Sequence, residues 1–138
     1  MKLPTPEPGL VIRYSFLFSD DTEKDRPAVI VLTALNDAGK KIVIVLPITH
    51  TPPAKGAETD SLELPPAIKR HLNLDDGRSW IRLTEANRFE WPGFDLREVG
   101  VGKAAYGFLP PRFFDQVKTA FLATDQDRRV WMQRRDET

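Results

Sequence analysis

Two almost uniformly apolar stretches, residues 27–35 and 41–48, constrain the fold of this chain more than any other feature of its sequence. They read PAVIVLTAL and KIVIVLPI, and the linker between them, NDAGK, is rich in turn-forming residues. An apolar strand without polar alternation is covered on both faces in a folded protein. We therefore predict that the two stretches form a hairpin at the centre of the core.

The other periodic segments indicate a mainly β fold with helices. Residue type and spacing predict strands at 10–18, 79–83 and 88–91, a short helix at 65–73 and a C-terminal helix at 110–123. The short helix follows a long polar loop, residues 49–61, which contains Pro and Gly. Because the strands are short and their connections mostly local, we expect a strongly bent sheet or a small barrel.

The length of 138 residues favours a single domain that spans residues 1–138. Residues 1–8 contain three prolines and suit an extended lead-in. Residues 124–138 form a charged tail, which we expect to fray unless Val130 and Trp131 hold it in place.

Composition excludes several classes of site. The 20 basic and 20 acidic residues cancel, so affinity for a polyanion has to come from local clustering of charge. The chain lacks cysteine and therefore thiolate zinc sites, and its two histidines, His50 and His71, are not spaced as a helical metal-binding pair. We predict no metal and no cofactor. No signal peptide and no apolar run of about 20 residues is present, which predicts a soluble cytoplasmic protein outside the membrane.

Three residues suited to phosphate chemistry come together if the hairpin forms. Arg26 directly precedes the first apolar strand, and Thr49 and His50 follow the second, so antiparallel pairing brings them to one end of the sheet. A guanidinium donates paired hydrogen bonds to phosphate, a hydroxyl orients a phosphate oxygen or a nucleophile, and an imidazole transfers protons near neutral pH. The set suits metal-free cleavage of a phosphodiester. Taken singly, Arg26 is more typical of a solvated loop charge and Thr49 of a turn-capping hydroxyl.

Three sequence segments resemble the MazF/PemK family of toxin endoribonucleases, and most of all its chromosomal PemK-like branch. They are EPGLVIRYSFLF, KDRPAVIVLTALN and KIVIVLPITH. The family shares a P-x-x-G strand start, a charged loop that ends in K-x-RP, and a later strand that ends in Pro, a hydrophobic residue and Thr. The resemblance covers residues 6–50 and is weaker from residue 62 to residue 91.

This resemblance implies a fold and an activity. The fold is a small SH3-like barrel with a C-terminal helix, usually a homodimer. The activity is that of a toxin in a type II toxin–antitoxin system, which cleaves single-stranded RNA without metal and is neutralised by an antitoxin protein. Arg26 then acts on the scissile phosphate as an acid or a charge stabiliser, and Thr49 positions the reacting groups. The 2′-hydroxyl attacks its own phosphate and leaves a cyclic phosphate and a free 5′-hydroxyl.

The chain departs from the family pattern at two places. His50 stands where the family has Ser or Thr, and the loop SDDTEKD, residues 19–25, carries four acidic residues and no histidine. We consider His50 either a general base or acid for the cleavage or a passive histidine at the rim. The acidic loop would repel RNA.

A further set of side chains is predicted to contact RNA beside this site. Its members are Lys24, Thr51, Arg82, Glu85 and Arg88. Glu85 and Arg88 fall where the family carries an acidic residue and a later arginine, although a solvated strand edge explains both equally well. The nearby aromatic residues either stack on bases or belong to the core or a dimer interface; they are Trp80, Phe89, Trp91 and Phe94.

Two non-catalytic hypotheses stay open beside the endoribonuclease. The acidic loop and the exposed hairpin ends favour a small-barrel module that binds nucleic acid or a peptide without cutting it. The second hypothesis is a dimeric protein that only binds an antitoxin-like peptide in a groove.

Overall fold

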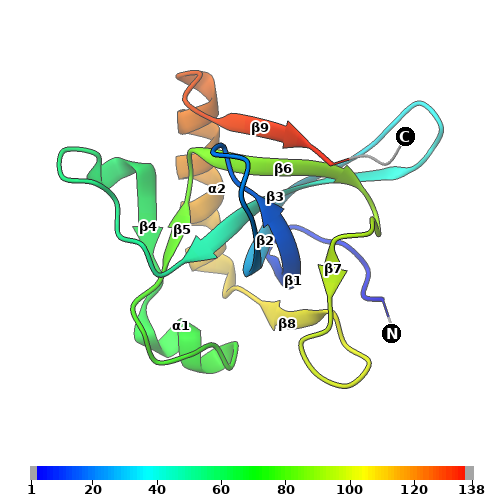
Figure 1. The fold of residues 1–138 in the computed structure, drawn as a ribbon, viewed down its shortest axis with the longest axis horizontal. Coiled ribbons are helices and arrows are strands. Elements are labelled where there is room, and N and C mark those ends of the chain that lie inside the picture. The colour runs from blue at the N-terminus through cyan, green and yellow to red at the C-terminus, as the bar shows by residue number, and fades with distance from the viewer. Residues whose placement is uncertain (1–2, 136–138) are drawn as a thin grey trace.

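The computed structural model describes residues 3–135 of the chain, which form one connected β-sheet and two α-helices (Figure 1). The strands are β1 (Leu10–Leu17), β2 (Glu23–Leu35), β3 (Lys41–Thr49), β4 (Ser61–Glu63), β5 (Trp80–Arg82), β6 (Glu85–Glu90), β7 (Leu96–Arg97), β8 (Ala105–Phe108) and β9 (Trp131–Arg134). The helices are α1 (Pro66–His71) and α2 (Pro111–Gln126), and a short 3-10 helix, η1, spans Glu58–Asp60. The described part of the chain is therefore mainly β with two α-helices, as predicted.

Strands β2 and β3 form the predicted central hairpin. Their antiparallel register pairs Ala28 with Pro47 at one end and Leu35 with Lys41 at the other. The turn is tight because the side-chain oxygen of Asn36 accepts hydrogen bonds from two backbone N–H groups of the turn, at 3.0 and 2.9 Å. The hairpin signal in NDAGK is confirmed.

Both faces of this hairpin are buried, and successive residues alternate between two core clusters. Residues of the first cluster, which also holds α2, include Val29, Val31, Leu46 and Ile48. Residues of the second cluster, which holds the aromatic side chains of β1, include Ala28, Ile30, Val43 and Val45. Successive side chains of a strand point to opposite faces, so a strand with a core on each side has no polar positions to alternate.

The sheet bends but stays open. Its hydrogen-bonded order is β4-β5-β3-β2-β1-β7, while β6 pairs with β3, β8 with β1 and β9 with β6. Two strands pair with the same edge of β3: β6 pairs with residues 42–45, and β5 pairs with residues 48 and 49. Within residues 3–135, β4 and β7 stand at opposite ends of this order and do not pair with each other. The sheet is therefore not closed.

Helix α2 covers the face of the sheet that carries the first cluster. Phe113, Val117 and Phe121 recur at helical spacing and are buried in that cluster. The helix starts at Pro111, where the missing N–H of a proline leaves no hydrogen bond unmade. The predicted C-terminal helix is confirmed, and it continues beyond the predicted end to Gln126.

The described residues after α2 do not fray, because β9 pairs in parallel with β6 (Figure 1). Val130, one of the two residues expected to hold the tail in place, packs against the first cluster. Backbone hydrogen bonds hold both ends of β9: Trp131 donates to the Thr84 carbonyl at 2.7 Å, and Arg135 donates to the Arg88 carbonyl at 2.8 Å. Strand β6 offers backbone groups along its outer edge, and β9 satisfies them. Residues 136–138 of the predicted tail and residues 1 and 2 of the predicted lead-in lie outside the described residues.

Among residues 3–135, neither α-helix has the length and apolar character needed to cross a bilayer.

Candidate active site

Arg26 and Thr49 line one pocket at the end of the β2–β3 hairpin, which we call the hairpin-end pocket. Because Ala28 pairs with Pro47, the residues just before Ala28 and just after Pro47 lie at the same end of the sheet. The pocket has a volume of about 260 Å³. Four other residues predicted to contact RNA also line it: Lys24, Thr51, Arg82 and Glu85. The turn between β1 and β2 supplies the rest of the wall: Phe18 and three residues of the acidic loop SDDTEKD, Ser19, Asp20 and Thr22.

Strand β2 begins at Glu23, inside the segment predicted to be a charged loop. The strand conformation places the basic and the acidic side chains of this segment on opposite sides. Alternate residues of a strand face opposite sides, and Lys24 and Arg26 both line the hairpin-end pocket. The neighbouring acids are paired with arginines that do not line it, Glu23 with Arg135 and Asp25 with Arg13. The acidic character of the loop is therefore partly neutralised away from the pocket.

The Arg26 guanidinium carries a positive charge into this pocket. The residue is half-buried, and its side chain donates a hydrogen bond to the Asp25 backbone carbonyl at 3.2 Å. No carboxylate among residues 3–135 lies at ion-pair distance from Arg26. A guanidinium without a carboxylate partner can donate two N–H groups to one phosphate.

The Thr49 hydroxyl is buried at the floor of the site and fixed by the backbone that follows it. Thr49 is 6% exposed. Its Oγ1 accepts a hydrogen bond from the Thr51 N–H and donates to the Thr51 carbonyl, both at 3.3 Å. These two bonds are long, so the hydroxyl can turn toward a better partner when one enters the pocket.

Arg82 and Glu85 form an ion pair in the pocket wall. The Nη1 atom of Arg82 lies 2.8 Å from a Glu85 carboxylate oxygen. The Cζ atom of the same guanidinium lies 5.7 Å from the centre of the Phe18 ring. The other Glu85 oxygen accepts the Ser19 N–H at 2.6 Å. The pair ties β5 and β6 to the β1–β2 turn, so both residues shape the pocket wall and their charges largely cancel.

Asp20 places a carboxylate at the rim of the pocket. The Thr22 hydroxyl and backbone N–H donate hydrogen bonds to it at 2.6 and 3.0 Å, and they lower the pKa of the Asp20 carboxyl below its usual value. Lys24 lowers this pKa further through its charge. Asp20 is therefore ionised at neutral pH and disfavours a second anion at this rim.

His50 does not line the hairpin-end pocket; it lines a neighbouring hollow of about 250 Å³ that we call the histidine hollow. Thr49 and Thr51 face the pocket and His50, between them in the sequence, faces the other side. Arg26 lines both spaces. The His50 Nε2 atom lies 2.8 Å from an Asp75 carboxylate oxygen, an interaction that no sequence motif indicated.

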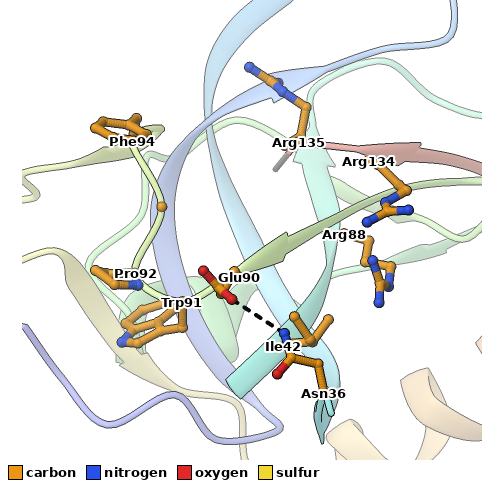
Figure 2. Close-up of a pocket in the computed structure, with 10 residues that line it drawn as sticks. Asn36, Ile42, Arg88, Glu90, Trp91, Pro92, Phe94, Arg134 and Arg135 are labelled. Carbon is orange, nitrogen blue, oxygen red and sulfur yellow. Dashed lines mark hydrogen bonds between the residues drawn. The ribbon is translucent and has the colours of Figure 1, made fainter. Parts of the chain in front are cut away.

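Arg88 lies apart from the other predicted residues, so the structure does not bring it into the same groove. It lines a pocket of about 510 Å³ near Ile42, at the opposite end of β3 from Thr49. Figure 2 shows Arg88 of β6 beside Arg134 of β9, with Phe94 on the far side of the pocket. At about 3.3 Å per residue, the two ends of β3 are about 26 Å apart.

The four aromatic residues singled out in the sequence divide between core and surface. Phe89 is 1% exposed and Trp80 is 8% exposed, so both are core residues. Trp91 is half-buried and packs against the second cluster, whereas Phe94 is 76% exposed. His71, to which no role is assigned, is exposed at the end of α1.

No protein-family model matches this chain, and no curated protein matches it. In the part of the chain that the structure describes, no group of three or more His, Cys, Asp or Glu side chains is arranged to hold a metal ion.

Proposed function

We propose that this chain is a toxin-type endoribonuclease that cleaves single-stranded RNA without a metal ion. The observation that carries the proposal is the convergence of Arg26 and Thr49 in one pocket, with Lys24 on the same side of β2. A phosphate in this pocket meets a guanidinium that no described carboxylate neutralises, an ammonium group and a buried hydroxyl. These groups suit a polyanionic substrate.

The proposed chemistry is an intramolecular displacement at phosphorus. The 2′-oxygen forms a bond to the adjacent phosphorus, and the bond from phosphorus to the 5′-oxygen breaks, which leaves a cyclic phosphate and a 5′-hydroxyl. Negative charge grows on the equatorial phosphate oxygens during this step, and a preorganised cation such as Arg26 is most effective there. Thr49, held by Thr51, orients the phosphate for in-line attack.

The resemblance to the MazF/PemK family extends the proposal to fold type and partners. We regard the bent, open sheet with α2 on one face as a variant of the small SH3-like barrel of that family. The proposed biological unit is a cytoplasmic homodimer whose activity an antitoxin protein neutralises, as in a type II toxin–antitoxin system.

The direct test is cleavage of a mixed-sequence single-stranded RNA in the presence of EDTA. We expect discrete fragments that end in a cyclic phosphate, and a rate that is about 10²- to 10³-fold lower in Arg26→Ala. Arg112→Ala is the matched control, because Arg112 is an exposed arginine on α2, and it should retain the full rate. An inactive wild-type protein, or an Arg26→Ala variant as active as the wild type, contradicts the proposal. Growth arrest on expression, relieved by Arg26→Ala, is the corresponding test in cells.

A non-catalytic module that binds RNA or an antitoxin-like peptide is the second candidate. The Asp20 carboxylate in the pocket wall favours it, because it repels the negative charge that grows on a reacting phosphate. If this candidate is right, RNA is retained in a gel-shift experiment without being cut, and Arg26→Ala weakens retention.

A further inference from the structure

The histidine hollow adjoins the candidate active site through a shared residue. Arg26 lines both the hairpin-end pocket and the histidine hollow. The hollow is lined on its other sides by His50, Asp75 and Tyr106. A phosphate that contacts Arg26 is therefore bound at the residue that the pocket shares with the hollow lined by His50.

The Asp75 carboxylate fixes which nitrogen of His50 carries a proton. Nε2 of His50 lies 2.8 Å from one carboxylate oxygen of Asp75 and 3.0 Å from the other. An ionised carboxylate only accepts hydrogen bonds, so Nε2 has to be the donor. In the neutral ring this leaves the Nδ1 lone pair free to accept a proton.

Asp75 is itself anchored by a buried lysine. The Lys69 ammonium lies 2.7 Å from an Asp75 oxygen, and the Lys69 side chain is only 6% exposed. The same ammonium group donates to the Ser79 hydroxyl at 2.7 Å and to the Gly77 carbonyl. These bonds use its three N–H groups and hold the loop between α1 and β5 in place.

The electrostatic environment keeps the Asp75 carboxylate ionised. The hydrogen bond from Lys69 has the largest effect and lowers the pKa of Asp75; partial burial raises it by less, and the hydrogen bond from His50 lowers it further. The other charged or titratable groups that line the hollow are Asp25 and Arg26 of β2 and Tyr106 of β8. The Asp25 carboxylate forms an ion pair with the Arg13 guanidinium at 2.6 Å. Burial raises the pKa of the Tyr106 hydroxyl, which is therefore neutral at neutral pH.

Gly77 lies beside the imidazole ring and the carboxylate. A Cβ atom at this position would lie 3.5 Å from Cδ2 of His50 and 3.7 Å from an Asp75 oxygen, which are ordinary van der Waals distances. The loop that carries Asp75 therefore also runs close to the His50 ring.

We propose that Asp75, held by Lys69, is the positioning residue that keeps His50 in the tautomer able to accept the proton of the attacking 2′-hydroxyl. In this step the hydroxyl proton passes to Nδ1 of His50, the 2′-oxygen bonds to phosphorus and the bond to the 5′-oxygen breaks. The 5′-oxygen takes a proton from water, and the imidazolium later returns its proton to the solvent. The Asp75 carboxylate stabilises the imidazolium while it exists. The inference rests on the proposed endoribonuclease activity and adds the general base and its support.

The kinetic test compares cleavage by the wild type, His50→Gln, Asp75→Asn and Asp75→Glu over a range of pH. We expect His50→Gln and Asp75→Asn to lower kcat by about 10²-fold or more with little change in KM, and Asp75→Glu to recover part of the rate. The acidic limb of the pH–rate profile should disappear in His50→Gln. Asp76→Asn is the matched control, because Asp76 is an exposed neighbour that does not line the hollow, and its rate should match that of the wild type. Rates of His50→Gln and Asp75→Asn within about twofold of the wild type overturn the inference.

A second measurement reads the tautomer without relying on cleavage. The chain has only two histidines, so ¹⁵N spectra of the imidazole rings show His50 beside His71 as an internal reference. We expect the neutral His50 ring to be protonated at Nε2 in the wild type and to lose this preference in Asp75→Asn. Thermal unfolding by circular dichroism confirms that each variant is folded. A wild-type ring protonated at Nδ1, or an unchanged tautomer in Asp75→Asn, overturns the inference.

These outcomes separate the inference from the proposed function. If Arg26→Ala abolishes cleavage while Asp75→Asn and His50→Gln cleave normally, the endoribonuclease stands and only the role of His50 and Asp75 is rejected. If the wild type cuts no RNA, the proposed function fails and the inference fails with it.

Discussion

The Lys69 ammonium lies 2.7 Å from the Asp75 carboxylate, although the Lys69 side chain is 6% exposed and the Asp75 side chain is 58% exposed. A buried lysine needs a partner for each of its N–H groups, and here the carboxylate reaches in from the surface while a hydroxyl and a carbonyl complete the set. The buried end of the pair therefore determines the position of the exposed end.

Replacing Lys69 should destabilise the loop that carries Asp75. Lys69→Met leaves the Ser79 hydroxyl and the Gly77 carbonyl without their donor, and we expect the free energy of unfolding to fall by about 2 kcal/mol. Lys118→Met, at an exposed position of α2, should change it by no more than about 0.5 kcal/mol. Urea unfolding followed by circular dichroism measures both, and equal midpoints for the two variants contradict the expectation.

Stability should fall in acid partly because of Asp75. Its pKa is lower in the folded protein than in the unfolded chain, so it stabilises the fold above the ordinary aspartate pKa of about 4. This stabilisation is lost as the pH falls through the folded-state pKa, where the carboxyl is protonated in both states. Unfolding midpoints measured from neutral pH to strong acid should therefore decline less steeply in Asp75→Asn than in the wild type. Some decline remains in the variant, since the pKa values of Asp20 and Glu63 are lowered too.

The Thr49 hydroxyl should matter more for cleavage than for folding. Thr49→Val removes two long hydrogen bonds to Thr51, and we expect a loss of at most about 1 kcal/mol in stability. Cleavage should fall by about 10-fold or more because the phosphate loses an orienting group, and Thr49→Ser should restore it. Thr119→Val, at an exposed position of α2, controls for the substitution itself. Full activity of Thr49→Val rules out an orienting role.

Lys24 and Arg88 should differ in their effect on RNA binding. Lys24 lines the hairpin-end pocket, whereas Arg88 lies in the pocket at the other end of β3. We expect Lys24→Ala to weaken binding and to reduce the slope of log affinity against log salt by about one, as the loss of one phosphate contact does. Arg88→Ala should leave the slope unchanged. Binding titrations at several salt concentrations measure this, and the opposite ranking would move the RNA path to the Arg88 pocket.

Helix α2 should contribute strongly to stability through Phe121. This side chain is 1% exposed in the first core cluster, and Phe121→Ala should lower the free energy of unfolding by about 3–5 kcal/mol. Leu122→Ala, at the adjacent position that is 43% exposed, should cost about 1 kcal/mol or less. Similar losses for the two variants would mean that α2 does not pack as the structure has it.

The position of Arg26 beside Thr49 was predictable because it depends on one local element. Once NDAGK makes a tight turn, an antiparallel ladder brings the start of β2 next to the end of β3. The separation of His50 from Thr49 does not follow from the ladder, because β3 ends at Thr49 and His50 lies in the bend after it. The hypothesis of one three-residue site therefore depended on the conformation of the chain just beyond the strand.

The partners of His50 could not be predicted in the same way. Asp75 and Lys69 come from a loop and a short helix whose placement against β3 depends on long-range packing. Strand β9 is similar: its charged sequence predicts fraying unless Val130 and Trp131 hold it, and nothing in that sequence indicates the edge of β6 with which it pairs. In both cases the contact that places the residues joins segments far apart in the chain, and no local sequence pattern predicts such a contact.

The parallel pairing of β9 with β6 has a consequence for the order of synthesis. Strand β6 leaves the ribosome before α2 and β9 do, so the nascent chain holds an unpaired strand edge until the last described strand has been made. An open edge of this kind can pair with another nascent chain. Ribosomes that stall within α2 should therefore produce chains that aggregate, and those that finish β9 should produce chains whose β6 edge is closed.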